Sequence, residues 1–147
     1  MATILLIHGP NLNRLGKRDS LNYGSKTLAD IEALVTAEAE ELGHTVKSFQ
    51  SNHEGALIDY LQNESGNADG IIINPGALTH YSYALLDALI DTGLPCVEVH
   101  LSDINSREEF RKISVTAPAC IAQISGKKEA GYIEALKILH KKLAKNV

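Results

Sequence analysis

The chain has 147 residues, of which 44% are hydrophobic and 22% are charged, and its formal net charge is −4. These values are typical of a soluble globular protein, and the length suits a single domain over residues 1–147. The negative charge disfavours non-specific nucleic-acid binding, and no apolar run approaches the roughly 18 residues of a membrane span. Because an apolar run begins almost at once, leaving no room for a signal peptide, we expect a cytoplasmic protein.

Strand and helix patterns alternate along the whole sequence. The apolar run at residues 4–7 predicts a buried strand, and Thr27, with Asp30 three residues later, predicts a capped helix that Gly43 ends. Ser106 begins a similar pattern, which predicts a short capped helix. The remaining expected elements are strands at residues 46–49, 71–73, 96–99 and 119–124, and helices around 57–61, from 83 up to 93, and at 130–145, the last burying Ile133, Leu136, Leu139 and Leu143.

This alternation predicts an α/β fold with a mostly parallel sheet between two layers of helices. Five strands in a chain of this length favour a flavodoxin-like three-layer sandwich with the strand order 2-1-3-4-5. Ligands of such sheets bind outside the carboxyl ends of the strands, at the point where the strand order reverses. We therefore expect a functional site where the first and third strands end.

Polar residues follow three of the predicted strands. Asn11 follows the first strand, Asn74 the third and His100 the fourth, so these side chains can converge at one edge of the sheet. Glu98 lies two residues before His100, hence on the same strand face, where its carboxylate could hold the imidazole in one tautomer. The pair suits acid–base catalysis, and a partly buried ion pair without chemistry is the alternative interpretation.

The segment at residues 16–24 is long for a connection in an α/β unit, and it carries Arg18 and Tyr23. A long loop over a strand end is frequently a lid, and a guanidinium near a tyrosine favours the phenolate form. A surface loop whose aromatic ring packs down is the alternative. Arg107 and Arg111, four residues apart on the predicted short helix, share a face that indicates either an anionic ligand or solvated charge.

His80 follows the turn at residues 74–77, near the start of a predicted helix whose backbone N–H groups could receive an anion. The histidines show no metal-ligand spacing and no glycine-rich nucleotide motif occurs, so we expect neither a metal nor a nucleotide cofactor. Cys96 and Cys120 form no metal or redox motif. We interpret both as small core residues of a protein from a reducing compartment.

Taken together, seven segments of the chain resemble type II 3-dehydroquinate dehydratase. They occur in the same order and at matching separations over nearly the whole chain, which makes the set far more specific than any one member. The segments are residues 9–13, Arg18 with residues 23–24, and residues 50–55, 74–77, 79–80, 98–102 and 107–111.

The resemblance implies a flavodoxin-like subunit that converts 3-dehydroquinate to 3-dehydroshikimate in the shikimate pathway, without a cofactor, by anti elimination of water through an enolate. Tyr23 would remove a C2 proton as phenolate, with Arg18 stabilising that form and the transition state. Asn11 would position a water against the enolate oxygen. His100, oriented by Glu98, would protonate the departing C1 hydroxyl.

The resemblance also implies how the substrate is held and how subunits assemble. Family members form trimers that assemble into dodecamers, in which an acid on the third helix, here Asp87, reaches the site of a neighbouring subunit. Residues 50–55 would lie near the trimer contact. We therefore expect a homo-oligomer that binds this small molecule and neither nucleic acid nor membrane. The groups that would hold the substrate are Asn74, His80, Arg111 and the backbone at Leu101 and Ser102.

Some positions depart from the family pattern without removing a catalytic residue: His8, Tyr81, Tyr83, Asp103 and residues 125–128. The main alternative is a non-catalytic flavodoxin-like binding or signalling module. Against it, residues 8–11 offer neither the acidic residues of a signalling receiver nor the hydroxyl-rich phosphate loop of a flavodoxin. An inactive family member kept for assembly or metabolite sensing is a second alternative, which the intact Tyr23, Arg18 and His100 oppose.

Overall fold

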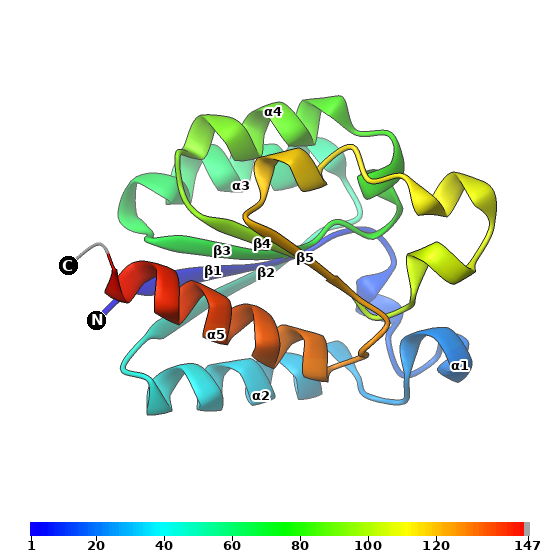
Figure 1. Ribbon diagram of the computed structural model, residues 1–147, viewed down its shortest axis with the longest axis horizontal. Helices are drawn as coiled ribbons and strands as arrows, with labels where there is room; N and C mark the ends of the chain where they lie inside the picture. Colours follow the sequence, from blue (N-terminus) through cyan, green and yellow to red (C-terminus); the bar gives the residue numbers. More distant parts are fainter. Residues whose placement is uncertain (146–147) are drawn as a thin grey trace.

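A parallel five-stranded sheet forms the centre of the computed structural model, which describes residues 1–145 (Figure 1). The strand order is β2-β1-β3-β4-β5, so the predicted α/β class and the predicted order are both confirmed. The strands are β1 (Thr3–His8), β2 (Thr45–Gln50), β3 (Gly70–Asn74), β4 (Cys96–His100) and β5 (Ala122–Ser125).

Two pairs of helices cover the two faces of the sheet. α3 and α4 lie over one face and α2 and α5 over the other, while the short α1 lies at the edge where the strands end (Figure 1). No helix within the described part of the chain is long and apolar enough to cross a membrane. The helices are α1 (Ser20–Tyr23), α2 (Leu28–Glu41), α3 (Glu54–Glu64), α4 (Tyr83–Thr92) and α5 (Ala130–Ala144).

The sheet separates two apolar cores, because successive side chains of a strand point to opposite faces. On β1, Ile4 and Leu6 pack in the core under α2 and α5, whereas Leu5 and Ile7 pack in the core under α3 and α4. The inner strands β1, β3 and β4 are buried almost throughout, since each has strand neighbours on both sides and helices on both faces. The edge strands β2 and β5 are partly exposed, which explains their more polar sequences.

The boundaries of α2 and α4 follow the signals in the sequence. Asp30 N–H donates to the Thr27 hydroxyl at 3.1 Å and Thr27 N–H donates to the Asp30 carboxylate at 3.0 Å, so the predicted cap is confirmed. Gly43, just after α2, has φ +81°, and Gly93 after α4 has φ +68°. Glycine adopts this left-handed conformation without steric cost, so both helices end where predicted.

The predicted capped helix at Ser106 is wrong. Ile104–Ser106 and Glu109–Lys112 form two separate 3₁₀ turns, and Arg107 is extended between them. Asp103 caps the first turn with its carboxylate, and its carbonyl accepts the Ser106 hydroxyl, so that hydroxyl does not cap a helix of its own. Arg107 therefore does not lie on a helix face with a partner four residues later.

The fifth strand is shorter than predicted. Ala117–Ala119 forms a 3₁₀ turn that includes Pro118, and the strand begins only at Ala122. Proline has no N–H to donate to a neighbouring strand, which favours a turn at this point.

The last helix, α5, buries a slightly different face from the predicted one. Leu136 and Leu139 are fully buried as predicted, but Ile133 and Leu143 are only partly buried. Tyr132 is fully buried instead. Residues three, four and seven positions apart lie on one helix face, so the buried stripe starts at Tyr132 rather than at Ile133.

Candidate active site

A pocket lies at the carboxyl edge of the sheet, where the segments after β1, β3 and β4 meet α1. This is the edge that the reversal of strand order between β1 and β3 predicts. Two predicted site residues do not line the pocket, since Glu98 is fully buried next to His100 and Asp87 lies exposed on α4. The predicted residues that line it are Asn11, Arg18, Tyr23, Asn74, His80, His100, Leu101, Ser102 and Arg111.

Close contact between the segments after β1 and β3 builds one wall of the pocket. A Cβ on Gly9 would lie 2.3 Å from the carbonyl oxygen of Pro75, so only glycine fits there. Asn11 adopts φ 70°, and its N–H donates to Asn52 Oδ1 at 2.9 Å. The segment after β2 therefore holds Asn11 in an unusual backbone conformation at the pocket mouth.

Tyr23 ends α1 and contacts two guanidinium groups. Arg107 Nη1 donates to the phenolic oxygen at 2.7 Å, and the guanidinium carbon of Arg18 lies 3.7 Å from the centroid of the ring. Arg18, the predicted partner, thus lies over the ring face, and Arg107 is the arginine that contacts the oxygen. The phenolic oxygen and the ring face of Tyr23 therefore each contact a positively charged group.

The sequence pattern indicated Arg107 only as a possible anion-binding partner of Arg111, and its place beside Tyr23 was not predicted. Arg107 also donates to the Ser102 hydroxyl at 3.3 Å, so it links α1 to the segment after β4. Its spacing from Arg111 assigned it to a helix that does not form, and that assignment concealed its contact with Tyr23. A signal was present, because both arginines lie within the family-like segment 107–111.

His100 is the last residue of β4 and is hydrogen-bonded to Glu98. Its Nε2 donates to Glu98 Oε2 at 2.9 Å, and both side chains lie on the same face of the strand, as predicted. Nδ1 is then the ring nitrogen that remains for a bound molecule. Glu98 therefore fixes the orientation of the His100 ring and leaves Nδ1 available to a ligand.

Glu98 is fully buried and accepts four hydrogen bonds. Besides His100, its donors are Gln123 Nε2 at 2.7 Å, Ser114 Oγ at 2.8 Å and the hydroxyl of Thr116. Burial alone would raise the pKa of the carboxyl, but the hydrogen bond and charge of His100 and the hydrogen bonds from Thr116 and Gln123 lower the pKa to about 2. The carboxylate is therefore charged at neutral pH and suited to stabilise a protonated imidazole.

Asn74 and His80 are fixed by neighbouring groups. Asn74 Oδ1 accepts the Gly76 N–H at 3.0 Å, and its Nδ2 donates to the Tyr132 hydroxyl at 3.1 Å. His80 Nδ1 donates to the carbonyl oxygen of Ile113 at 2.8 Å. One hydrogen on Asn74 Nδ2 and the second ring nitrogen of His80 therefore remain for a ligand.

Arg111 reaches the pocket from the turn Glu109–Lys112. Its Nε donates to the Glu108 carboxylate at 2.5 Å, and Glu108 is largely exposed. A bound anion would thus engage the outer guanidinium nitrogens of Arg111 without displacing this contact.

His8, at the end of β1, is paired in the sheet with Asn74 and has an unusual environment. Its side chain is fully buried, and neither ring nitrogen has a hydrogen-bond partner among residues 1–145. The nearest aromatic ring is that of Tyr132, with 6.2 Å between ring centroids. Burial lowers the pKa of His8 to about 4, so the folded protein holds this imidazole neutral at neutral pH.

The buried His8 is expected to make folding stability fall in mild acid. The unfolded chain binds a proton at a pKa near 6.5 and the folded chain only near 4, so stability is lost as pH falls through this interval and is unaffected above it. At pH 4 the loss is about 3 kcal/mol. Urea unfolding from pH 7 to pH 4 measures it, and His8→Asn should remove this part of the pH dependence.

His53→Asn, at an exposed histidine, is the matched control for that experiment. An identical pH dependence in wild type and His8→Asn would show that His8 is protonated as readily in the folded as in the unfolded chain.

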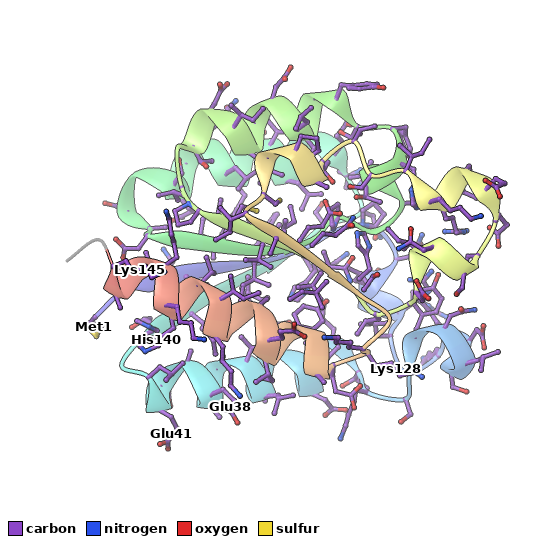
Figure 2. All side chains as sticks on the ribbon, viewed as in Figure 1. Met1, Glu38, Glu41, Lys128, His140 and Lys145 are labelled. Atoms are coloured by element: carbon purple, nitrogen blue, oxygen red, sulfur yellow. The ribbon has the colours of Figure 1, made fainter. Side chains whose placement is uncertain are left out.

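A second, larger cavity of about 440 Å³ lies at the opposite edge of the sheet. Figure 2 shows Met1, His140 and Lys145 at that edge, whereas Lys128 lies at the edge with the pocket. His44 Nε2 and His140 Nδ1 are hydrogen-bonded at 2.8 Å, so the two imidazoles satisfy each other. Within residues 1–145 no cluster of three or more potential metal ligands occurs. Arginines, a tyrosine and the histidine–glutamate pair converge only at the smaller of these two cavities. We therefore identify that pocket as the candidate active site.

The comparisons of this chain with known proteins agree on one family. A family model described as "Dehydroquinase class II" matches residues 2–140. A 3-dehydroquinate dehydratase of Roseiflexus castenholzii is 55% identical over 136 residues, or 92% of this chain and 87% of that protein. One of Clostridium beijerinckii is 53% identical over 144 residues, or 97% and 99%. The crystal structure of a type II dehydroquinase from Butyrivibrio crossotus matches with a TM-score of 0.91 and 47% identity, over 94% of this chain and 97% of that one.

Proposed function

The chain belongs to the class II dehydroquinase family, which dehydrates 3-dehydroquinate in the shikimate pathway, and we propose that it removes water by anti elimination through an enolate. Such a lyase needs a base beside the ketone, groups that stabilise the enolate, and an acid for the departing hydroxyl. The observation that carries the proposal is the convergence of an arginine-bound tyrosine and a carboxylate-bound histidine on one pocket.

In this proposal Tyr23 acts as the base. As a phenolate, with Arg107 at its oxygen and Arg18 over its ring, it takes a proton from C2 of the substrate. The electron pair left on C2 moves into the adjacent ketone and forms the enolate. Asn11, held at the pocket mouth, positions a water that donates to the enolate oxygen.

His100 acts as the general acid. As the electron pair of the enolate forms the new double bond and the C1–O bond breaks, the protonated His100 donates its proton to the leaving hydroxyl, which departs as water. Glu98 remains charged throughout and stabilises the protonated ring. Tyr23 ends as a phenol and His100 as a neutral imidazole, so one proton must pass from Tyr23 to His100 before the next turnover.

The substrate is proposed to bind through groups at the far side of the pocket. Arg111 suits the substrate carboxylate because a guanidinium can hold both of its oxygens. Asn74 and His80, each with a polar atom remaining, suit its hydroxyls. The backbone at Leu101 and Ser102 completes this set. No step of the proposed reaction needs a cofactor.

The proposal is tested by adding 3-dehydroquinate to metal-stripped protein and following the ultraviolet absorbance of the conjugated enone product. A rise at roughly 1 to 1000 turnovers per second would support it. No rise from folded protein would contradict it and would favour the flavodoxin-like binding module. Visible absorbance of the purified protein would then reveal a bound flavin.

We further propose that the chain forms trimers that assemble into dodecamers. Tyr83 and Ile90 on the outer face of α4 are 66% and 55% exposed, and exposed apolar side chains that lie together are typical of interfaces. Asp87 follows Tyr83 by one helical turn on this face. Its carboxylate could therefore enter the pocket of a neighbouring copy.

Asp87→Ala is expected to raise KM for 3-dehydroquinate about tenfold with little change in kcat, because a hydrogen bond to a charged group is worth roughly 1.5–3 kcal/mol. Steady-state kinetics, with light scattering to confirm the assembly, measure the effect. Asp91→Ala, one turn further along the same helix, is the matched control. An unchanged KM in the intact assembly would show that Asp87 does not touch the substrate.

A further inference from the structure

The two cysteines of the chain lie against each other outside the pocket. Cys96 is the first residue of β4 and is fully buried, whereas Cys120, just before β5, is only partly buried. The Cys120 thiol donates to Cys96 Sγ, with 3.4 Å between the sulfur atoms. Both were predicted to be core residues, and the structure adds that they are in contact.

We propose that Cys96 and Cys120 are a reversible dithiol–disulfide site that a hydroperoxide oxidises, and that the disulfide lowers turnover through Glu98. A disulfide has its sulfur atoms about 2.05 Å apart, so the two thiols need to approach by about 1.4 Å. Cys120 follows the single 3₁₀ turn Ala117–Ala119, outside the regular sheet, and that segment can supply this movement.

The oxidation proceeds in two balanced steps. The partly exposed sulfur of Cys120 attacks the peroxide, so that an S–O bond forms, the O–O bond breaks and water leaves with the thiol proton. Cys96 then attacks the sulfenic sulfur, the S–S bond forms, the S–O bond breaks, and the hydroxide leaves as water with the proton of Cys96. The two thiols lose two electrons and the hydroperoxide gains them.

The two sulfurs have different roles because their environments differ. The hydrogen-bonding contact with Cys120 and burial raise the pKa of the Cys96 thiol well above its usual range. Cys96 therefore stays protonated and out of contact with solvent. It acts only on a sulfenic acid formed next to it, which makes Cys120 the residue that meets the oxidant.

Thr116 connects the cysteine pair to the active site. Its carbonyl oxygen lies 3.7 Å from Cys120 Sγ, and its hydroxyl donates to the Glu98 carboxylate. Glu98 also lies two residues after Cys96 on the same face of β4. Drawing Cys120 toward Cys96 therefore moves the turn that carries Thr116, and with it a donor that fixes the partner of His100.

The experiment treats the intact protein with hydrogen peroxide and follows mass, free thiols and kinetics. We expect a loss of two hydrogen atoms in mass, loss of both free thiols, and full reversal by dithiothreitol. We expect kcat to fall about tenfold with KM little changed. A misplacement of about 1 Å in an active site can lower the rate up to a hundredfold, and here the displacement reaches His100 only through Thr116 and Glu98. Because the chain has two cysteines, the mass assigns the bond without ambiguity.

Cys120→Ser and Cys96→Ser are the matched controls, and both should keep kcat after peroxide. A wild-type mass that gains oxygen, or does not change, overturns the disulfide. A disulfide that forms without lowering kcat overturns the link to Glu98. The kinetic readout rests on the proposed roles of Glu98 and His100, whereas the mass and thiol readouts do not, so failure of one proposal can be distinguished from failure of the other.

Discussion

Replacing Tyr23 by phenylalanine is expected to lower kcat about a thousandfold and to leave the affinity for 3-dehydroquinate nearly unchanged, since general-base catalysis contributes roughly 10²–10⁴. The change removes one oxygen atom and keeps the ring that Arg18 covers. The substrate-binding groups proposed above lie on other segments, so they are not disturbed. Steady-state kinetics give kcat, and calorimetric titration of the inactive variant gives the affinity.

Tyr60→Phe is the matched control for this variant. Tyr60 is also partly buried and stacks on Phe49, with 4.3 Å between ring centroids, but it lies on α3, away from the pocket. It should retain wild-type kcat. Substantial turnover in Tyr23→Phe would assign the base to another residue, and a large loss of affinity would indicate that the phenolic oxygen binds substrate in the ground state.

The order of the sheet could be predicted from the sequence because it depends on local patterns. Apolar runs such as 71–73 are buried on both faces, and the helices between them leave only a parallel arrangement with few possible orders. The capped start at Thr27 was predictable for the same reason, since both partners lie within one turn. The Ser106 pattern is locally similar and failed, because Asp103 already holds that hydroxyl.

Only those site residues that lie on strands or directly after them could be placed from the sequence. His100 and Glu98 share a strand face whatever the rest of the fold does, so their pairing follows from spacing alone. Arg107 is different, because its contact with Tyr23 joins positions 84 residues apart, one at the end of α1 and the other between two 3₁₀ turns. No periodicity encodes how far a side chain reaches from an irregular segment, and the same holds for the isolation of His8.

The hydrogen bonds around Glu98 were also beyond the reach of spacing. Ser114, Thr116 and Gln123 come from a turn and an edge strand that follow Glu98 by 16 to 25 residues. A buried carboxylate needs such donors to remain charged, so a residue placed on β4 depends on the later fold of another segment. The proposed acid function of His100 thus rests on more of the chain than its own strand.

Glu98→Gln tests that dependence and is expected to lower kcat about a hundredfold. The carboxylate aligns His100 and stabilises its protonated form, and replacing the buried acid of a comparable histidine pair by an amide costs up to about 10⁴. Glutamine keeps the size of the side chain but removes the charge. KM should change little, since Glu98 does not line the pocket. Glu38→Gln, on the exposed side of α2 (Figure 2), is the control.

The same variant separates catalysis from folding through its pH dependence. Four donors surround Glu98, and a glutamine offers them one neutral oxygen in place of two charged ones, so at least one charge-assisted hydrogen bond is lost, at a cost of about 2 kcal/mol. In the wild type the pKa of Glu98 falls from an ordinary 4.5 to about 2 on folding, so its contribution of about 3 kcal/mol is present above pH 4.5 and is lost as pH falls toward 2. Urea unfolding should therefore show the free energies of unfolding of the two proteins converging in acid.

Two outcomes would contradict these expectations. A variant that keeps wild-type kcat would show that His100 needs no charged partner. A difference in the free energy of unfolding that does not shrink in acid would show that Glu98 is not ionised in the fold.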